Sequence, residues 1–357
     1  MRAAVYHGPR DVRVELVSDP SPPERGEVLL RVRRAGICGT DAHEYLHGPV
    51  LVPLQQRHPA SGHLGPTILG HEFAGEIVDV GPGVERFGVG DRVVPGAGVW
   101  CGTCDWCLAG RTNLCKTYYT LGLHANGGLA EYALVPERMC YLVPAACSDD
   151  AAGLAQPMAI AFHAVRRARV SSGQTVVVVG SGGIGAFIIV AALAQGASEV
   201  VAVDLDETRL RTAGALGAAR TVNARDEDPA QAIARLTRGE GAHVVVEASG
   251  APDAPGVALA SVRRGGVVLI VGLQSERRPV DLLDLAMREI ELTSTWAHVC
   301  DLDLPHALAT LAARDPSALV VERVVPLERL VPDGLVPLAG HRTHGKILVD
   351  PSAVSRK

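Results

Sequence analysis

The stretch TVVVVGSGGIGAFIIVAALAQ, residues 175–195, decides the fold. Its four consecutive valines, 176–179, show no alternation of apolar and polar residues, which predicts a strand buried on both faces of a parallel sheet. A glycine-rich turn follows and opens an apolar helix, so the stretch fits the strand, G-x-G-x-x-G, helix pattern of a dinucleotide-binding unit. Gly180 allows the tight turn, Gly182 lets a pyrophosphate approach the backbone, and Gly185 lets the helix pack on the strand.

The first helical residues after this turn, Gly183 and Ile184, would offer their N–H groups to the phosphates of the dinucleotide. A second apolar run, 200–203, ends in Asp204, about 20 residues after the motif, where such units place a carboxylate for the ribose hydroxyls. The same charge would repel a 2′-phosphate, so the sequence predicts NAD rather than NADP. Arg209, assigned to the same cofactor site, slightly weakens that preference. A strand-end or helix-capping role is the alternative for Asp204.

Composition narrows the class of protein. The chain has 357 residues, which predicts about two domains, and 47% of its residues are hydrophobic, enough for a large core. A net charge of −5 and a pI of about 6.2 favour neither nucleic acid nor an anionic membrane as partner. No signal peptide is recognisable, and we expect a cytoplasmic protein.

The pattern of apolar and polar residues changes along the chain. Residues 1–155 carry short alternating runs between Gly/Pro turns, such as Ala3 to Tyr6 and Val28 to Val32, typical of a β-rich domain, and residues 1–17 alternate like a strand. The segment 47–67 holds five prolines and is expected to be irregular. Strand-like and helix-like runs then alternate through 156–295, which predicts an α/β fold with a doubly wound parallel sheet. Residues 296–357 add a helix and a last strand at 345–349.

Four cysteines stand close together in the pattern C-x2-C-x2-C-x7-C, at Cys101, Cys104, Cys107 and Cys115. Four thiolates on one loop can close a tetrahedral site and leave no position open for substrate, which predicts structural zinc. An iron–sulfur cluster takes the same ligands and is the alternative. Such a cluster of thiols suits a reducing compartment better than a disulfide framework does.

A second set of candidate metal ligands comes from two separate parts of the chain. Cys38 lies in GICGT, and His71 with Glu72 lies in LGHEF, 33 residues later. These motifs, the four cysteines, NGGLAEY at 126–132 and the dinucleotide motif follow the order found in the zinc-dependent medium-chain alcohol dehydrogenases. The chain resembles that family over nearly its whole length. CGTDAHEYLHGP at 38–49 and LGHEFAGEIVDVG at 69–81 are most similar to its butanediol and sorbitol dehydrogenase branch, and GKILV at 345–349 also fits.

The resemblance implies a GroES-like catalytic domain built from both chain ends, with the Rossmann domain inserted and the active site in the cleft between them. It implies that Cys38 and His71 are ligands of a catalytic zinc and that Glu72 is a direct or alternating ligand. Thr40 and His43 occupy the positions of the proton relay. The pocket would be lined by residues placed only loosely: Tyr45, His47, Trp100, Leu123 and His298.

One position departs from this branch, which usually has an acidic residue where this chain has Gln156. Some sugar dehydrogenases of the same superfamily also carry glutamine there. A neutral amide would leave the site less negative, weaken zinc binding and strengthen its Lewis acidity. A structural role near the start of a helix is the alternative for Gln156.

The sequence therefore predicts an NAD-dependent zinc enzyme with two zincs, one catalytic and one structural. It would interconvert a secondary alcohol or vicinal diol and its ketone, as in 2,3-butanediol and acetoin. A polyol, sugar or cyclitol dehydrogenase of the same family is the alternative, and a non-catalytic protein on this fold a remote one. A zinc-free reductase would lack Cys38 and His71. The expected partner is a small alcohol, and the family suggests a homodimer or homotetramer.

Overall fold

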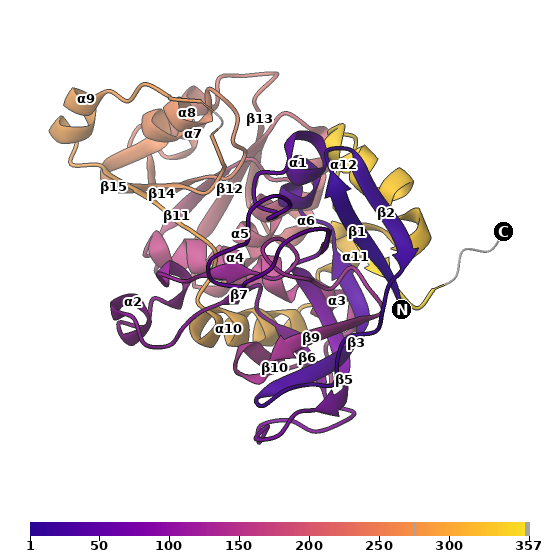
Figure 1. Ribbon diagram of the computed structural model, residues 1–357. Coiled ribbons are helices and arrows are strands. Elements are labelled where there is room, and N and C mark those ends of the chain that lie inside the picture. The colour runs from indigo at the N-terminus through magenta and orange to yellow at the C-terminus, as the bar shows by residue number, and fades with distance from the viewer. Residues whose placement is uncertain (275, 354–357) are drawn as a thin grey trace. The chain divides into compact units, whose positions relative to one another are not determined.

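The structure, a computed structural model, describes residues 1–274 and 276–353. The chain divides into two compact units, Met1–Gln156 with Val299–Lys357 and Pro157–His298. The first unit is therefore built from both ends of the chain, and the second is one continuous segment inserted between them (Figure 1). No helix among the described residues is long and apolar enough to cross a membrane.

Three sheets make up the first unit. One has the order β2-β1-β4, a seven-stranded sheet has the order β10-β6-β5-β3-β18-β17 with β9 also on β3, and β7 pairs with β8. β17 and β18 are parallel, and the other pairs are antiparallel. The strands are β1 Arg2–Gly8, β2 Asp11–Leu16, β3 Glu27–Gly36, β4 Thr67–Ile68, β5 Glu72–Val80, β6 Arg92–Pro95, β7 Gly98–Val99, β8 Tyr119–Thr120, β9 Tyr132–Pro136, β10 Cys140–Leu142, β17 Val321–Pro326 and β18 Lys346–Asp350.

The helices of this unit are α1 Gly39–His47, α2 Asp105–Leu108, α3 Asp149–Gly153, the 14-residue α10 Cys300–Ala313, α11 Ser317–Val320 and α12 Val336–Ala339. Single turns of 3-10 helix lie at Thr112–Leu114, Glu137–Met139 and Leu327–Arg329, and a π-helical turn at Leu330–Leu335. No helix or strand lies between α1 and β4, which confirms the irregular segment predicted there.

The second unit is a six-stranded, fully parallel sheet of order β13-β12-β11-β14-β15-β16, the doubly wound arrangement that the sequence predicts. Its strands are β11 Thr175–Val179, β12 Glu199–Asp204, β13 Arg220–Asn223, β14 Ala242–Glu247, β15 Val262–Ile270 and β16 Glu291–Ser294. Its helices are α4 Ala155–Arg167, which begins in the first unit, α5 Gly183–Ala194, α6 Glu207–Leu216, α7 Pro229–Leu236, α8 Ala254–Ser261 and α9 Leu282–Met287.

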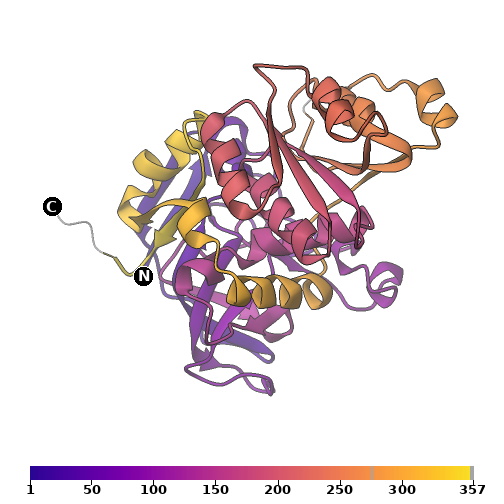
Figure 2. The same cartoon turned by 180° about the vertical axis from the view of Figure 1, so that it is seen from behind.

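Helices cover both faces of this sheet, which explains why its central strands are apolar without alternation (Figure 2). Val177 and Val179 of β11 belong to one core cluster with Ala232 and Ile233 of α7. The intervening Val176 and Val178 are also fully buried, on the other side of the pleat. α9 is the exception among the helices of this unit, because none of its side chains is fully buried and only Leu285 packs on the core cluster.

The N-terminal segment that alternates like a strand, residues 1–17, forms two strands. The run Ala3 to Tyr6 lies within β1, and the chain then turns back and pairs β2 antiparallel to it. Arg10, two residues after Gly8, adopts a positive φ of 60° at that turn. Ala3 to Tyr6 are all buried, so apolar residues occupy both faces of β1 and the pattern does not reveal where the strand ends.

Candidate functional site

Cys38, His71 and Glu72 lie together in the first unit, with their potential ligand atoms all within 4.8 Å of one another. The pairing of β3 with β5 causes this, because Gly36 at the end of β3 lies opposite Glu72 at the start of β5. Cys38 follows β3 as the N-cap of α1, and His71 directly precedes β5. A side chain at Gly36 would collide with the Glu72 carboxylate, at 2.2 Å from Oε2, so glycine leaves the space that this carboxylate occupies.

Asp41 orients the cysteine and the histidine. Its Oδ2 accepts a hydrogen bond from the Cys38 backbone N–H at 2.9 Å, and its Oδ1 lies 3.5 Å from Nδ1 of His71. A carboxylate on one ring nitrogen is the usual outer partner of a metal-binding histidine, and it leaves Nε2 as the ligand atom. Burial lowers the pKa of His71, but the charges of Asp41 and Cys38 outweigh it and raise that pKa well above 6.5. Metal binding at His71 would therefore release a proton.

Glu72 has a second partner, the buried ammonium group of Lys346. Nζ of Lys346 donates a hydrogen bond to Oε2 of Glu72 and another, of 3.0 Å, to the carbonyl oxygen of Ile37. Lys346 is the first residue of β18, which pairs with β3, so a strand from the far end of the chain brings this base to the site. One carboxylate oxygen of Glu72, Oε2, is therefore occupied by the hydrogen bond from Lys346.

The donor set fits a catalytic zinc. One thiolate, one imidazole and one carboxylate are ligand types that catalytic zinc sites use, and three protein ligands leave a position open for substrate. Because Lys346 already holds Glu72, Cys38 and His71 are the two strongest candidate ligands of the three.

The four cysteines form a second cluster, again with all ligand atoms within 4.8 Å. The Sγ atom of Cys107 lies 3.9 Å from that of Cys101 and 3.6 Å from that of Cys104. Tetrahedral zinc with bonds of about 2.3 Å would separate its sulfurs by about 3.8 Å, so the spacing fits zinc. Backbone N–H groups of Thr103 and Cys104 donate to Cys101 and, with the Thr103 hydroxyl, lower the pKa of its thiol to about 5. Cys101 is therefore prepared to bind as a thiolate.

The other predicted catalytic residues lie on or near α1. Oγ1 of Thr40 lies 3.7 Å from Sγ of Cys38, so its hydroxyl is next to the candidate zinc ligands. His43 is exposed, with its ring 5.1 Å from that of His47.

Gln156 is buried at the start of α4, and within the described part of the chain its side chain has no hydrogen-bond partner. Of the five loosely placed residues, His47 is exposed, and the other four are buried: Tyr45, Trp100, Leu123 and His298.

The glycine-rich turn has the geometry that its sequence predicts. Gly180 has a φ of +92°, and a side chain at Gly185 would lie 1.8 Å from the Gly180 carbonyl oxygen. Gly182 is the N-cap of α5, whose first residues are Gly183 and Ile184. The guanidinium of Arg209 lies close over Gly182, because a Cβ there would be 3.1 Å from Cζ.

Asp204 lies at the end of β12, as predicted, and is largely buried. Its Oδ2 accepts hydrogen bonds from the backbone N–H of Ser181 at 2.8 Å, and its Oδ1 from those of Leu205 and Asp206 at 2.8 and 3.0 Å. In this structure the carboxylate therefore holds the glycine-rich turn onto β12. That contact places it beside the phosphate-binding turn.

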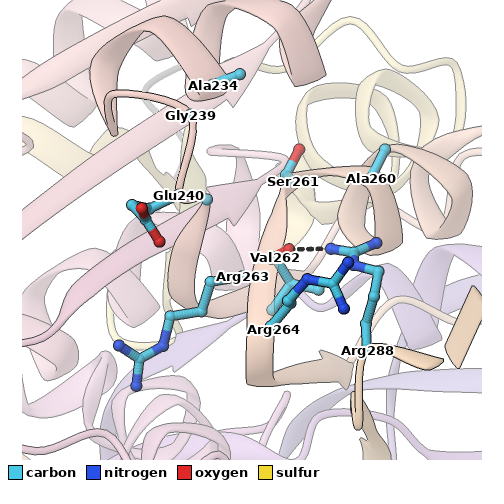
Figure 3. A pocket seen from close by; sticks show the side chains of 10 residues that line it. Ala234, Gly239, Glu240, Ala260, Ser261, Val262, Arg263, Arg264 and Arg288 are labelled. Carbon is cyan, nitrogen blue, oxygen red and sulfur yellow. Dashed lines mark hydrogen bonds between the residues drawn. The ribbon is translucent and has the colours of Figure 1, made fainter. Parts of the chain in front are cut away.

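A cavity of about 470 Å³ lies elsewhere in the second unit, at the amino ends of β14 and β15 (Figure 3). Three arginines line it, but two of them bind helix ends: Arg288 donates to the carbonyls of Leu259 and Val262 at the end of α8, and Arg264 to that of Met287 in α9. Positive charge at a helix C-terminus is a stabilising device. The glycine-rich turn follows the carboxyl end of β11, whereas this cavity lies at the amino ends of the strands. The cavity is therefore no part of the candidate site.

Among the buried charged residues that sequence reasoning missed are Asp41, Lys346 and Glu247, the last of which ends β14. Asp41 could have been found, because it stands three residues after an N-cap, where an acidic side chain reaches back to the cap N–H. Lys346 and Glu247 carry no such signal, since each reads as the ordinary end of a strand.

Comparison with known proteins identifies the family. Residues 24–145 match the alcohol dehydrogenase GroES-like domain, and residues 183–313 match the zinc-binding dehydrogenase family. The chain is 37% identical to sorbitol dehydrogenase of Bacillus subtilis (strain 168), over 82% of this chain and 81% of that one. It is 33% identical to (R,R)-butanediol dehydrogenase of the same strain, over 99% and 100%.

Solved structures of dehydrogenases have the same fold as this chain. The crystal structure of 2R,3R-butanediol dehydrogenase from Bacillus subtilis superimposes with a TM-score of 0.91 at 32% identity, covering 98% of this chain and 99% of that chain. A zinc-binding dehydrogenase from Sinorhizobium meliloti 1021, bound to NADP, gives a TM-score of 0.87 at 28% identity and coverages of 98% and 99%.

The fold and the donor sets define a zinc-binding oxidoreductase with GroES-like and Rossmann parts. The chain belongs to the zinc-dependent medium-chain alcohol dehydrogenase family. The predictions of fold class, family and enzyme class are confirmed. The roles of individual residues stay predictions.

Proposed function

We propose that this chain is an NAD-dependent zinc enzyme that interconverts a secondary alcohol or vicinal diol and its ketone, of the 2,3-butanediol and acetoin type. The observation that carries the proposal is the grouping of Cys38, His71 and Glu72 within 4.8 Å in a chain that also has a glycine-rich turn at the start of α5. The relation to a butanediol dehydrogenase over nearly the whole length supports this substrate class.

In this proposal Cys38 and His71 hold the catalytic zinc, and Asp41 keeps His71 in the tautomer that binds metal. When bound, zinc polarises the alcohol oxygen and the nicotinamide ring accepts a hydride. The Thr40 hydroxyl, next to Cys38, would accept the proton of the alcohol as it gives up its own proton in the direction of exposed His43, which would release a proton to solvent. Gln156 contributes a neutral amide to the same site.

NAD is the proposed cofactor because Asp204, at the end of β12, would accept hydrogen bonds from the ribose hydroxyls and repel a 2′-phosphate there, although Arg209 lies 4.0 Å from its carboxylate and reduces that repulsion. The family does not decide this point, since a solved relative is described as bound to NADP. We further propose two zincs per chain, the second held by Cys101, Cys104, Cys107 and Cys115. A cytoplasmic location would keep these thiols reduced.

A polyol or sugar substrate is the second candidate. The relation to sorbitol dehydrogenase and the neutral Gln156 favour it. A steady-state screen of butanediols, acetoin, polyols, aldoses and simple secondary alcohols with both cofactors separates the candidates. We expect the highest kcat/KM for a vicinal diol with NAD. Higher efficiency with a polyol would replace the first substrate class, and equal or higher efficiency with NADP would refute the Asp204 argument.

We propose that two copies of the chain associate through the β16 edge of the parallel sheet. Among the described residues β16 pairs only with β15, and large apolar side chains around it are exposed: Leu273, Leu282, Leu283, Met287, Leu292 and Trp296. An open edge beside an apolar surface is self-complementary in an antiparallel pair about a two-fold axis. Light scattering should give a dimer or a multiple of it, and Leu292→Lys should shift it toward monomer.

A further inference from the structure

Glu247 is a fully buried carboxylate at the centre of the parallel sheet. It is the last residue of β14, where it lies opposite Val179 of β11 and Ile270 of β15. Within residues 1–274 and 276–353 it forms no ion pair with a basic side chain. Burying an unpaired charge is costly unless hydrogen bonds replace its water. The hydrogen bonds that stabilise Glu247 therefore indicate what the residue does.

These bonds come from the turn that follows β14. Oε1 of Glu247 accepts from the backbone N–H of Ser249 at 2.7 Å, from the Ser249 hydroxyl at 2.7 Å and from the backbone N–H of Gly250 at 2.8 Å. Oε2 faces the amide nitrogen of Gln274, in the loop after β15, at 3.4 Å. Hydrogen bonds to a carboxylate are stronger than neutral ones. The side chain thus fixes the backbone of the 248–250 turn.

This turn packs directly on the dinucleotide-binding turn. A Cβ at Gly180 would lie 2.7 Å from Cβ of Ser249 and 2.8 Å from its backbone nitrogen, so Gly180 and Ser249 touch without an intervening side chain. The other side of the Gly180 turn is held by Gly185 at equally close range. Gly180 is therefore clamped between the start of α5 and a turn whose shape the Glu247 carboxylate sets.

We propose that Glu247 is a positioning residue for cofactor binding: its buried carboxylate holds Ser249 against Gly180 and so keeps the phosphate-binding turn in its binding geometry. The inference rests on the nicotinamide cofactor of the proposed function. A hydrophobic residue would fill the same place in the sheet at no electrostatic cost, but it would leave the N–H groups of Ser249 and Gly250 unbonded.

The test compares Glu247→Ala and Glu247→Gln with Val244→Ala. Val244 is a buried core residue of the same strand that touches neither turn through a side-chain hydrogen bond, so it provides a matched loss of stability. The readouts are the Kd of NADH from its fluorescence, the Tm, and the separate kcat and KM for NAD. E247A should raise Kd and KM at least about tenfold, which corresponds to about 1.4 kcal/mol, with kcat at saturating NAD within twofold.

E247Q should have a smaller effect, because its amide oxygen can still accept from Ser249 and Gly250. V244A should lower Tm and leave Kd within twofold. The proposal is overturned if E247A binds NADH as tightly as the parent, or if V244A weakens binding equally at the same loss of Tm.

If E247A does not fold, E247Q and Ser249→Ala decide. S249A removes one hydroxyl donor and keeps the Cβ that touches Gly180, and each variant should raise Kd between twofold and tenfold. Unchanged Kd in both overturns the proposal. If the parent chain itself binds no nicotinamide nucleotide, the proposed function fails, which is a different result from equal binding by parent and variant.

Discussion

The two candidate metal sites of the first unit differ in how they are assembled. The four-cysteine lobe takes all its ligands from residues 101–115, and Cys101 in it is exposed. The Cys38 site takes its residues from the end of β3, the start of β5 and, through Lys346, the start of β18, and His71 and Glu72 are buried. The lobe depends on a loop, whereas the other site depends on the sheet.

This difference should separate stability from catalysis. A closed site with four thiolates has no position for substrate, so its metal contributes to folding alone. In the buried site, each charged group offsets the cost of removing its neighbour's charge from water. The following predictions test this separation, from the largest expected effect to the smallest.

His71→Ala removes a proposed ligand of the catalytic zinc. We expect kcat/KM to fall about 1,000-fold, or roughly 4 kcal/mol, and zinc content to fall by one per chain, with a small change in Tm. His7→Ala, a half-exposed histidine paired with Glu15 in the β1–β2 hairpin, is the control and should keep both zinc and activity. Retention of two zincs and full turnover by H71A would remove His71 from the site.

Lys346→Met should destabilise the protein, because it leaves the Glu72 carboxylate buried without its base. Breaking such a pair costs about 3–5 kcal/mol, and adding Glu72→Gln should restore part of that loss. Lys116→Met is the control in the lobe, where Lys116 forms an exposed pair with Asp105 at 2.9 Å and the expected change is below about 1 kcal/mol. Equal losses in denaturant unfolding would contradict the contrast between the two regions.

Cys104→Ser should remove the structural zinc. We expect metal content to fall by one zinc and Tm to fall by several degrees, while the folded enzyme keeps kcat within about tenfold, since the lobe binds no substrate. Cys147→Ser, a buried cysteine outside the cluster, should keep both metals. Iron instead of zinc in the parent would favour the iron–sulfur alternative, and a loss of turnover as large as in H71A would show that the two regions are not separable.

Gln156→Glu tests the proposal that Gln156 faces the catalytic zinc, where the substitution would add a negative charge. It should move the alkaline rise of turnover to higher pH, by up to about one pKa unit or 1.4 kcal/mol, and slow the loss of zinc to a chelator. The reason is that negative charge favours the protonated form of a bound water or alcohol. Gln195→Glu, at the exposed end of α5, is the control. An unchanged pH profile and unchanged chelator resistance would place Gln156 outside the site.

His124 lies in the segment that follows the four-cysteine lobe. Gly122 and Gly127 of this segment pack against Gly70, the residue before His71. Burial and the nearby charge of His58 lower the pKa of His124 to about 4, and its Nδ1 accepts from the backbone N–H of Thr120. The folded pKa is below the unfolded value of about 6.5. The stabilising effect is therefore complete above pH 6.5 and is lost as pH falls toward 4.

His124→Asn keeps an acceptor for Thr120 and does not titrate. The fall in Tm between pH 7 and pH 4.5 should therefore be smaller than in the parent, by a few degrees at most. The same pH dependence in both proteins would show that protonation of His124 does not affect stability.

The sequence by itself determined the features whose residues are close together in the chain. The valine run, the glycine-rich turn and the four-cysteine loop are local, and their spacing alone implies a strand, a phosphate-binding turn and a tetrahedral site. Family resemblance added Cys38 and His71. The sequence pattern did not reveal the turn between β1 and β2, because apolar residues occupy both faces of β1.

Only the tertiary structure decided the partners of the buried charges. Lys346 meets Glu72 across 274 residues because β18 pairs with β3, and no local pattern predicts that pairing. The turn that Glu247 holds packs on the glycine-rich turn because β14 lies beside β11. A buried charge has to find its counter-charge or its hydrogen bonds in three dimensions. Its role follows from which strands are neighbours in the sheet, and the residue type alone leaves that role open.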